Sequence, residues 1–222
     1  MRVERKDMAR EACEKARMTL ELLLGLFGFA FVTSVTPGPN NLMLLASGVN
    51  FGLRRTVPHM LGISLGHAFM VLAVGLGLMG LMEAWPASRT LLKVAAVLYM
   101  LWLAWKIATA APPPNDRAPD AADETERGRP FTFLQAAAFQ WVNPKAWVMA
   151  LGALAAYAPE RTLAAVALVA FLFAAVNLPS VGLWAWAGEK LRIWLTEPSR
   201  LRLFNVTMAL LLVASLVPIV ME

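Results

Sequence analysis

One lysine stands out among the residues that could do chemistry. Lys145 is the only Lys or Arg well inside a predicted apolar span, and Gln140, Trp141 and Asn143 lie just before it. A charged side chain at mid-membrane depth is costly, so such residues usually face a cavity, a partner or a ligand. No Asp or Glu lies deep in any span. A cation without a protein anion favours an anionic ligand such as a carboxylate, and the alternative is snorkelling of the side chain to the headgroups.

Two helix-breaking motifs could build the rest of such a site. The first is Thr36-Pro37-Gly38-Pro39-Asn40-Asn41, and the second is Asn143-Pro144-Lys145. An interrupted helix leaves free amides at one end and free carbonyls at the other. The amides and the positive end of the helix dipole attract anions, whereas the carbonyls suit an ammonium group. The motifs therefore predict complementary sites for a zwitterion, and the plainer alternative is a pair of tolerated proline kinks capped by the asparagines.

Two further polar positions lie deep in apolar runs. His67 follows Gly62 and Gly66, whose spacing allows a neighbouring helix to approach closely. The unperturbed pKa of histidine lies near neutrality, so His67 is a candidate for proton coupling, as is Lys145, and an ordinary buried histidine is the alternative. Asn177 begins a polar kink that we expect to line the same cavity. The predicted substrate-binding residues are Pro37, Gly38, Pro39, Asn40, Asn41, Gln140, Asn143, Pro144, Lys145 and Asn177.

The composition describes the chain that must position these residues. Of 222 residues, 59% are apolar and 16% are charged, against about half and about a quarter in a typical soluble chain. With one cysteine and two histidines, no disulfide within the chain, no metal site and no other cofactor is expected. The net charge of +5 does not indicate nucleic acid, because the basic residues lie at the ends of apolar runs. The composition favours an integral membrane protein.

The apolar runs predict an all-α membrane protein with six spans. Each run approaches or exceeds the ~20 residues that a helix needs to cross the bilayer core. Segment 111–130, rich in proline and charge, is predicted to be a disordered loop, and it separates two halves of three spans each, 18–110 and 131–222. A repeat with an odd number of spans is inserted in opposite orientations, so we expect two inverted three-helix repeats, with helices one and four broken at the proline motifs. The runs are Leu20–Val49, Met60–Met82, Leu91–Ala110, Phe131–Ala156, Thr162–Ala187 and Leu203–Val220.

Positive charges predict the orientation of the spans. Most loop Lys and Arg residues lie in 50–58, 106–130 and 188–202. The positive-inside rule places these loops in the cytoplasm and both termini on the opposite side. The charged tail 1–17 lacks the features of a signal peptide, and Met18 is a sensible alternative start. We therefore expect the tail to be a misassigned extension.

Several of these segments resemble a known family. The Thr36–Asn41 motif, the turn Gly52-Leu53-Arg54-Arg55 and the Gly62–His67 segment resemble the LysE family of bacterial amino-acid exporters, especially its homoserine and threonine efflux branch. The segment Phe139–Ala146 is similar to the second hallmark of that family. The resemblance implies a six-helix carrier of the bacterial inner membrane, without enzymatic activity, which exports amino acids or related zwitterions by proton antiport. In that membrane, the orientation predicted from the positive charges makes both termini periplasmic. The family's motif residues correspond to Pro37, Gly38, Pro39, Asn40, Asn143, Pro144 and Lys145.

Other functions stay open on the sequence. A divalent-cation exporter would need intramembrane Asp, Glu or Cys ligands, which the apolar runs lack. A membrane-embedded enzyme would need a catalytic set, and His67, Asn177 and Ser180 form no recognisable one. A structural subunit would gain nothing from two deep helix breaks. The expected partners are a small amino-acid substrate and membrane lipid; nucleic acid is excluded, and a homodimer is left open.

Overall fold

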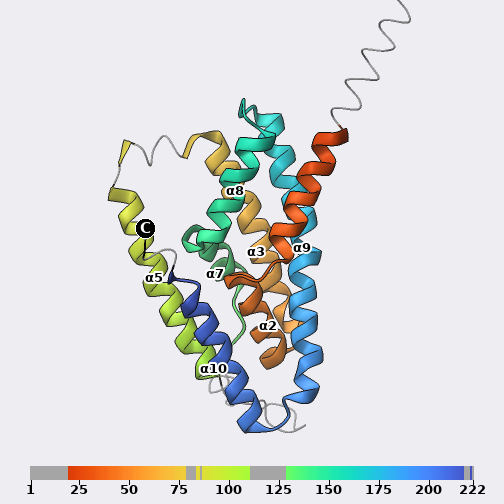
Figure 1. Cartoon of the computed structure of the whole chain (residues 1–222), viewed down its shortest axis with the longest axis vertical. Helices are drawn as coiled ribbons and strands as arrows, with labels where there is room; N and C mark the ends of the chain where they lie inside the picture. Colours follow the sequence, from red (N-terminus) through yellow and green to blue (C-terminus); the bar gives the residue numbers. More distant parts are fainter. Residues whose placement is uncertain (1–19, 79–83, 86, 111–128, 218–220, 222) are drawn as a thin grey trace, which may run out of the picture.

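The computed structural model describes residues 20–78, 84–85, 87–110, 129–217 and 221. The tail 1–17 and most of the loop predicted at 111–130 lie outside these residues. Within them the chain is helical and has no strand, and the helices form one elongated bundle (Figure 1). The elements are the helix Leu20–Val35, α2 (Pro39–Phe51), α3 (Leu53–Ala73), η1 (Val74–Leu78), α5 (Ala87–Ala108), α7 (Phe133–Phe139), η2 (Gln140–Val142), α8 (Pro144–Tyr157), α9 (Leu163–Leu191), η3 (Arg192–Trp194) and α10 (Pro198–Ala214).

The first apolar run forms two helices that meet at an angle. The helix Leu20–Val35 and α2 are bent by 55° at a short break. Thr36 and Gly38 each precede a proline, which disfavours the helical conformation at both positions, and Gly38 is extended with φ −179°. Pro39 then begins α2, where its missing amide hydrogen removes no helical hydrogen bond.

The fourth run is interrupted as well. α7 ends at Phe139, and η2 leads into Asn143, whose backbone is extended with φ −90° and ψ 109°. Pro144 begins α8, and the Asn143 Oδ1 accepts a hydrogen bond from the Lys145 amide at 3.1 Å. This is an ordinary N-cap. Both predicted helix breaks are therefore present.

Three described helices are long and apolar enough to cross a membrane. They are Leu53–Leu78, Thr90–Ala108 and Leu163–Trp194, and the bent pair Leu20–Val35 with Pro39–Phe51 makes a fourth if it is one span. At 14 and 17 residues, α8 and α10 are shorter than the ~20 residues of a straight span. The chain is thus a multi-pass membrane protein, with three or four candidate spans among the residues described.

Glycines allow two pairs of helices to approach closely. A Cβ on Gly48 of α2 would collide with the backbone of α9, and a Cβ on Gly188 of α9 would collide with the backbone of α2. Gly62 and Gly66 of α3 meet α7 in the same manner, and a Cβ on Gly66 would lie 2.5 Å from the Ala137 Cα. The close helix approach predicted for Gly62 and Gly66 is confirmed.

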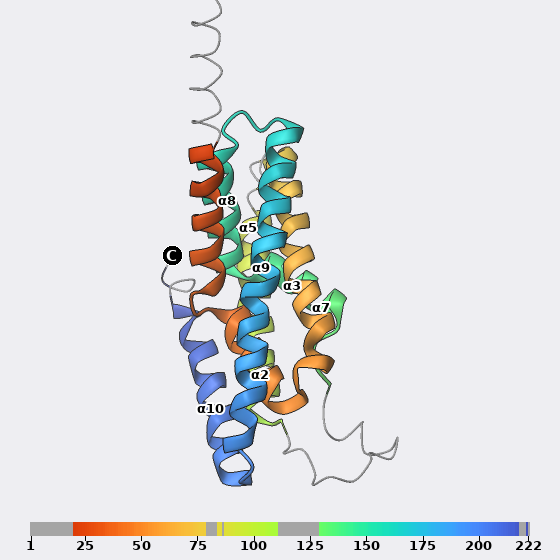
Figure 2. The same ribbon diagram turned by 90° about the vertical axis from the view of Figure 1, so that its right-hand side faces the viewer.

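The two helix breaks meet in the middle of the bundle. The helix Leu20–Val35 and α8 lie in the upper half of Figure 1, α2 lies in the lower half and α7 lies near mid-height, whereas α9 runs along most of the length (Figures 1 and 2). α3 packs against α9 and α7, and α5 packs against α10. This arrangement brings Thr36 and Lys145, which are 109 residues apart, into direct contact.

Candidate functional site

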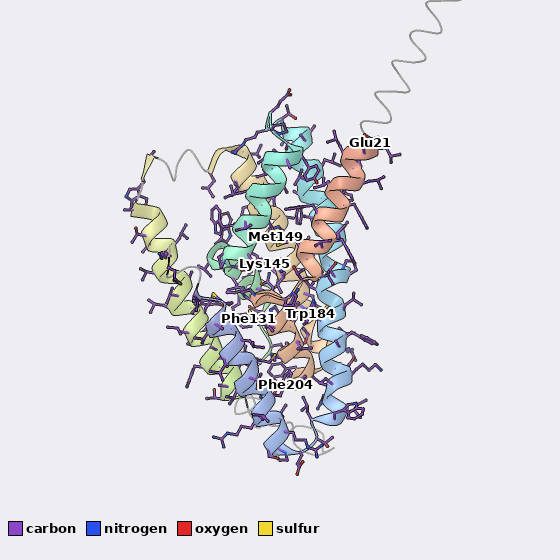
Figure 3. All side chains as sticks on the ribbon, viewed as in Figure 1. Glu21, Phe131, Lys145, Met149, Trp184 and Phe204 are labelled. Carbon is purple, nitrogen blue, oxygen red and sulfur yellow. The ribbon has the colours of Figure 1, made fainter. Side chains whose placement is uncertain are left out.

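The Lys145 ammonium lies against the carbonyl end of the helix Leu20–Val35. Its Nζ donates hydrogen bonds to the Thr36 carbonyl oxygen at 2.7 Å, to Thr36 Oγ1 at 2.9 Å and to the Pro37 carbonyl oxygen at 3.3 Å. These three oxygens are called the carbonyl site below. They carry no formal charge, but a helix C-terminus carries the negative end of the dipole. The side chain that begins in the second break therefore ends at the first, near the mid-height of the molecule (Figure 3).

Gly38 makes room for the Lys145 side chain. A Cβ at this position would lie 2.7 Å from the Lys145 Cδ and 3.2 Å from its Nζ. The backbone of Gly38 is extended, a conformation open to any residue. Space, not backbone conformation, is therefore the reason for glycine at position 38.

Side chains satisfy the carbonyl groups that end the first helix. The Asn41 Nδ2 donates to the carbonyl oxygens of Ser34 at 2.8 Å and Thr36 at 2.7 Å. The Trp184 Nε1 donates to the Val35 carbonyl oxygen at 3.0 Å. Helix ends leave such groups without partners inside the helix. Asn41 therefore caps the first helix, which is the plainer of its two predicted roles.

The amide end of α2 is open by comparison. Gly38 is its N-cap and has no side chain, so no side-chain hydrogen bond caps this helix. The first-turn amides are at the positive end of the helix dipole. α8 differs because Asn143 caps it. The start of α2 is therefore the better place for an anionic group of a ligand.

Asn40 and Gln140 connect the two breaks by a pair of hydrogen bonds. The Asn40 Nδ2 donates to the Gln140 Oε1 at 2.9 Å, and the Gln140 Nε2 donates to the Asn40 Oδ1 at 3.2 Å. The Gln140 side chain is fully buried and also donates to the Ala136 carbonyl oxygen at 2.9 Å. Two of the predicted binding residues are thus hydrogen-bonded to each other.

The helices α9 and α3 contribute Asn177 and His67 to the site. The Asn177 Nδ2 donates to the Ser34 Oγ at 3.1 Å, and the Ser64 Oγ donates to the Asn177 Oδ1 at 2.9 Å. His67 is 2% exposed, and its ring lies 5.1 Å from that of Phe173, centroid to centroid. No hydrogen-bond partner for the His67 Nε2 occurs in the part of the chain that the structure describes. His67 therefore brings an unpaired polar atom to the site.

These side chains surround a small cavity of about 20 Å³. A cavity holds one water molecule from about 10–15 Å³ upward, so helices must move before an amino acid fits. Among the described residues of the lining, Lys145 is the only Lys or Arg, and none is Asp or Glu. The lining residues are Thr33, Ser34, Gly38, Asn40, Asn41, His67, Gln140, Asn143, Lys145, Ala146, Met149, Asn177 and Val181.

The structure separates the predicted residues into two groups. Pro37, Pro39 and Pro144 shape the breaks but do not line the cavity, whereas the other predicted residues and His67 do. Sequence reasoning missed the lining residues Thr33, Ser34, Ala146, Met149 and Val181. Their signal was helical spacing, because Met149 lies one turn after Lys145, and Thr33 and Ser34 lie in the turn before Pro37. Over the described ranges, no three His, Cys, Asp or Glu side chains gather in a way that could hold a metal.

Comparison with known proteins identifies the family. A family model described as LysE type translocator matches residues 23–216. Two curated relatives, from Escherichia coli (strain K12) and Salmonella choleraesuis (strain SC-B67), are each 33% identical over 199 residues, covering 88% of this chain and 96% of the relative. Both are named cysteine/O-acetylserine efflux protein, not homoserine or threonine efflux protein. No solved structure matches the chain. Because the family model covers most of the sequence, the chain belongs to the LysE type translocator family.

Proposed function

We propose that this chain exports small neutral amino acids from the cytoplasm. Membership of the family makes the chain a transporter and not an enzyme. Cysteine and O-acetylserine are the first candidate substrates, because the relatives reported above carry these names. The observation that carries the proposal is the meeting of two broken helices at one cavity, beside which the Lys145 ammonium, the open amides of α2 and the backbone carbonyls of Thr36 and Pro37 lie together.

The charges of the site favour a neutral zwitterion. A basic amino acid or a divalent cation would add positive charge beside Lys145, in a cavity where no described lining residue is acidic. Like charges that share a poorly solvated site repel each other strongly. We propose that the substrate carboxylate binds near Lys145 and the first turn of α2, in reach of Asn40 and Asn143. Its ammonium group then faces the carbonyl site.

The helix contacts support two inverted three-helix repeats. In such a pair of repeats, each helix of the first half corresponds to one of the second half. The helix Leu20–Val35 corresponds to α7, α2 to α8, α3 to α9 and α5 to α10. The observed contact of α2 with α9 then becomes the contact of α8 with α3, which is also observed. The pairs α3 with α9 and α5 with α10 map onto themselves. We propose six membrane-crossing segments on this basis, of which the fourth consists of α7 and α8 and the sixth of α10.

The proposed transport cycle follows from the small size of the cavity. At about 20 Å³ the site holds no amino acid, so substrate enters after one repeat has rocked away from the other. The segments 50–58, where α2 meets α3, and 188–202, where α9 leads to α10, lie together at the lower end in Figure 1, and there the Leu53 amide donates to Glu189 Oε1 at 3.2 Å. We place this basic end in the cytoplasm by the positive-inside rule, and both termini in the periplasm of the bacterial inner membrane.

We further propose that proton antiport drives export. A proton-coupled carrier needs a titratable group at the substrate site, and His67 and Lys145 are the His and Lys residues that line the cavity. His67 is the better candidate, because its Nε2 has no hydrogen-bond partner among the described residues and histidine ordinarily titrates near neutral pH. Lys145 already donates three hydrogen bonds.

Uptake into everted membrane vesicles tests the proposed function. Their cytoplasmic face is outside, so export from the cytoplasm is measured as uptake. We expect labelled cysteine or O-acetylserine, with reductant present, to accumulate when the vesicle lumen is acidic and to leave when an uncoupler is added. Lys145→Ala abolishes accumulation, whereas Lys93→Ala, a lysine on α5 outside the cavity lining, retains it. If no amino acid in a full panel accumulates, the proposal is wrong.

A further inference from the structure

We propose that the Lys145 ammonium and the substrate ammonium bind the carbonyl site in turn. The inference rests on the proposed export of a zwitterion and concerns how that zwitterion is recognised. A lysine ammonium and an α-ammonium carry the same charge and three N–H donors each. Lys145 already uses its three donors on Thr36 O, Thr36 Oγ1 and Pro37 O, at 2.7, 2.9 and 3.3 Å. These oxygens therefore form a site of the right kind for a primary ammonium.

The carbonyl site has no room for two ammonium groups at once. A carbonyl oxygen has two lone pairs, and those of Thr36 already accept from the Lys145 Nζ and from the Asn41 Nδ2, the latter at 2.7 Å. A substrate ammonium can bind there only after Lys145 has left. The exchange has a route, because Thr36 and Pro37 are exposed and the Lys145 side chain is half-buried. Gly38 leaves the space beside the Lys145 Cδ free of any side chain.

Once displaced from the carbonyl site, the Lys145 ammonium needs an anionic partner, and the carboxylate of a zwitterionic substrate is one. Leaving the half-buried Lys145 ammonium without acceptors is unfavourable, and the described residues of the cavity lining include no Asp or Glu as a new partner. The substrate carboxylate supplies this partner when its ammonium takes the carbonyl site. An amine without a carboxylate would leave two cations together, and a carboxylate without an ammonium would leave Lys145 on its carbonyl acceptors. The exchange therefore selects molecules that carry both groups.

Chemical rescue of a truncated lysine tests the exchange. The full-length Lys145→Ala protein, purified in detergent, leaves the carbonyl site open, and the Tm is measured with ethylammonium chloride added. We expect a saturable rise of about 3 °C near ten times the Kd of ethylammonium. Tetramethylammonium, which has no N–H donor, gives no such rise. In Lys93→Ala and in the wild type, ethylammonium has no such effect, because Lys145 already occupies the site.

A second measurement uses the wild type and does not depend on the folding of a variant. L-cysteine, 3-mercaptopropionate and cysteamine share a thiol side chain and differ only in which charged groups they carry. We expect cysteine to stabilise the wild type, and each single-charge analogue to bind at least about tenfold more weakly, which corresponds to 1.4 kcal/mol. If 3-mercaptopropionate binds as tightly as cysteine, or if ethylammonium fails to rescue a folded Lys145→Ala protein, the exchange is wrong.

The two measurements separate this inference from the proposed function. If ethylammonium rescues Lys145→Ala and the wild type transports no amino acid, the carbonyl site binds ammonium but the substrate class is wrong. If cysteine is transported and 3-mercaptopropionate competes equally well, export is supported and the exchange is overturned. If cysteine does not bind, the same comparison is made with the amino acid that accumulates in vesicles and its deaminated analogue.

Discussion

Asn40 and Gln140 exchange two hydrogen bonds through their side-chain amides, with N···O distances of 2.9 and 3.2 Å. Asn40 lies in the first turn of α2, and Gln140 is the first residue of η2. The pair therefore joins the two helix breaks directly, beside the contact of Lys145 with Thr36. Any movement that opens the cavity between the breaks must either separate these two amides or move them together.

The amide pair is expected to stabilise the closed cavity. Gln140→Leu and Asn40→Leu each leave one amide without its partner, and both variants should have a lower Tm than the wild type. In a double-mutant cycle we expect a coupling energy of about 0.6–1.7 kcal/mol, as is found for polar pairs between membrane helices. The cycle is measured by thermal unfolding of all four proteins in one detergent. Strictly additive effects would show that the pair contributes nothing.

Gly38→Ala is expected to displace Lys145 from the carbonyl site. The new Cβ would lie 2.7 Å from the Lys145 Cδ, so this flexible side chain must move away. The displaced ammonium then loses hydrogen bonds to its acceptors, and hydrogen bonds to charged groups contribute about 1.5–3 kcal/mol. Vesicle uptake should fall roughly tenfold, since 1.4 kcal/mol is a factor of ten. The matched control is Gly28→Ala, where a new Cβ has nothing within 4 Å. Equal uptake by the two variants would contradict the role assigned to position 38.

Gly66→Ala is expected to destabilise the contact between α3 and α7. Its Cβ would lie 2.5 Å from the Ala137 Cα, a backbone atom that cannot turn aside. We expect a loss of stability of about 1–3 kcal/mol, measured as a lower Tm. Gly182→Ala is the control, because its nearest atom is the flexible end of the Met60 side chain at 3.1 Å. The prediction fails if both variants unfold at the same temperature.

His67→Gln is expected to separate proton coupling from substrate exchange. Glutamine keeps a polar group in the cavity but does not titrate, so uptake driven by a pH gradient should be lost while counterflow of labelled against unlabelled substrate continues. His59→Gln is the matched control. His59 is also buried on α3, with its ring 5.1 Å from that of Phe131, but it does not line the cavity. Proton-driven uptake by His67→Gln at the wild-type rate would assign the proton to another group.

The sequence by itself predicts features that depend on local backbone chemistry. Pro37, Pro39 and Pro144 restrict their own backbones and those of the residues before them, wherever the surrounding helices lie. Both breaks could therefore be predicted, as could the close approach at Gly62 and Gly66, since a missing side chain leaves space at any helix surface. The family resemblance also follows from these motifs.

The partners of the site residues depend on how the helices are rotated and paired. Asn40 and Asn41 are neighbours in the sequence, yet Asn40 pairs with Gln140 and Asn41 caps the first helix. Adjacent residues on a helix point about 100° apart, so the rotation of α2 decides which asparagine has which partner. The acceptors of Lys145 lie 108 and 109 residues away in the chain. Only the packing of one break against the other determines that contact, because no local pattern relates residues so distant.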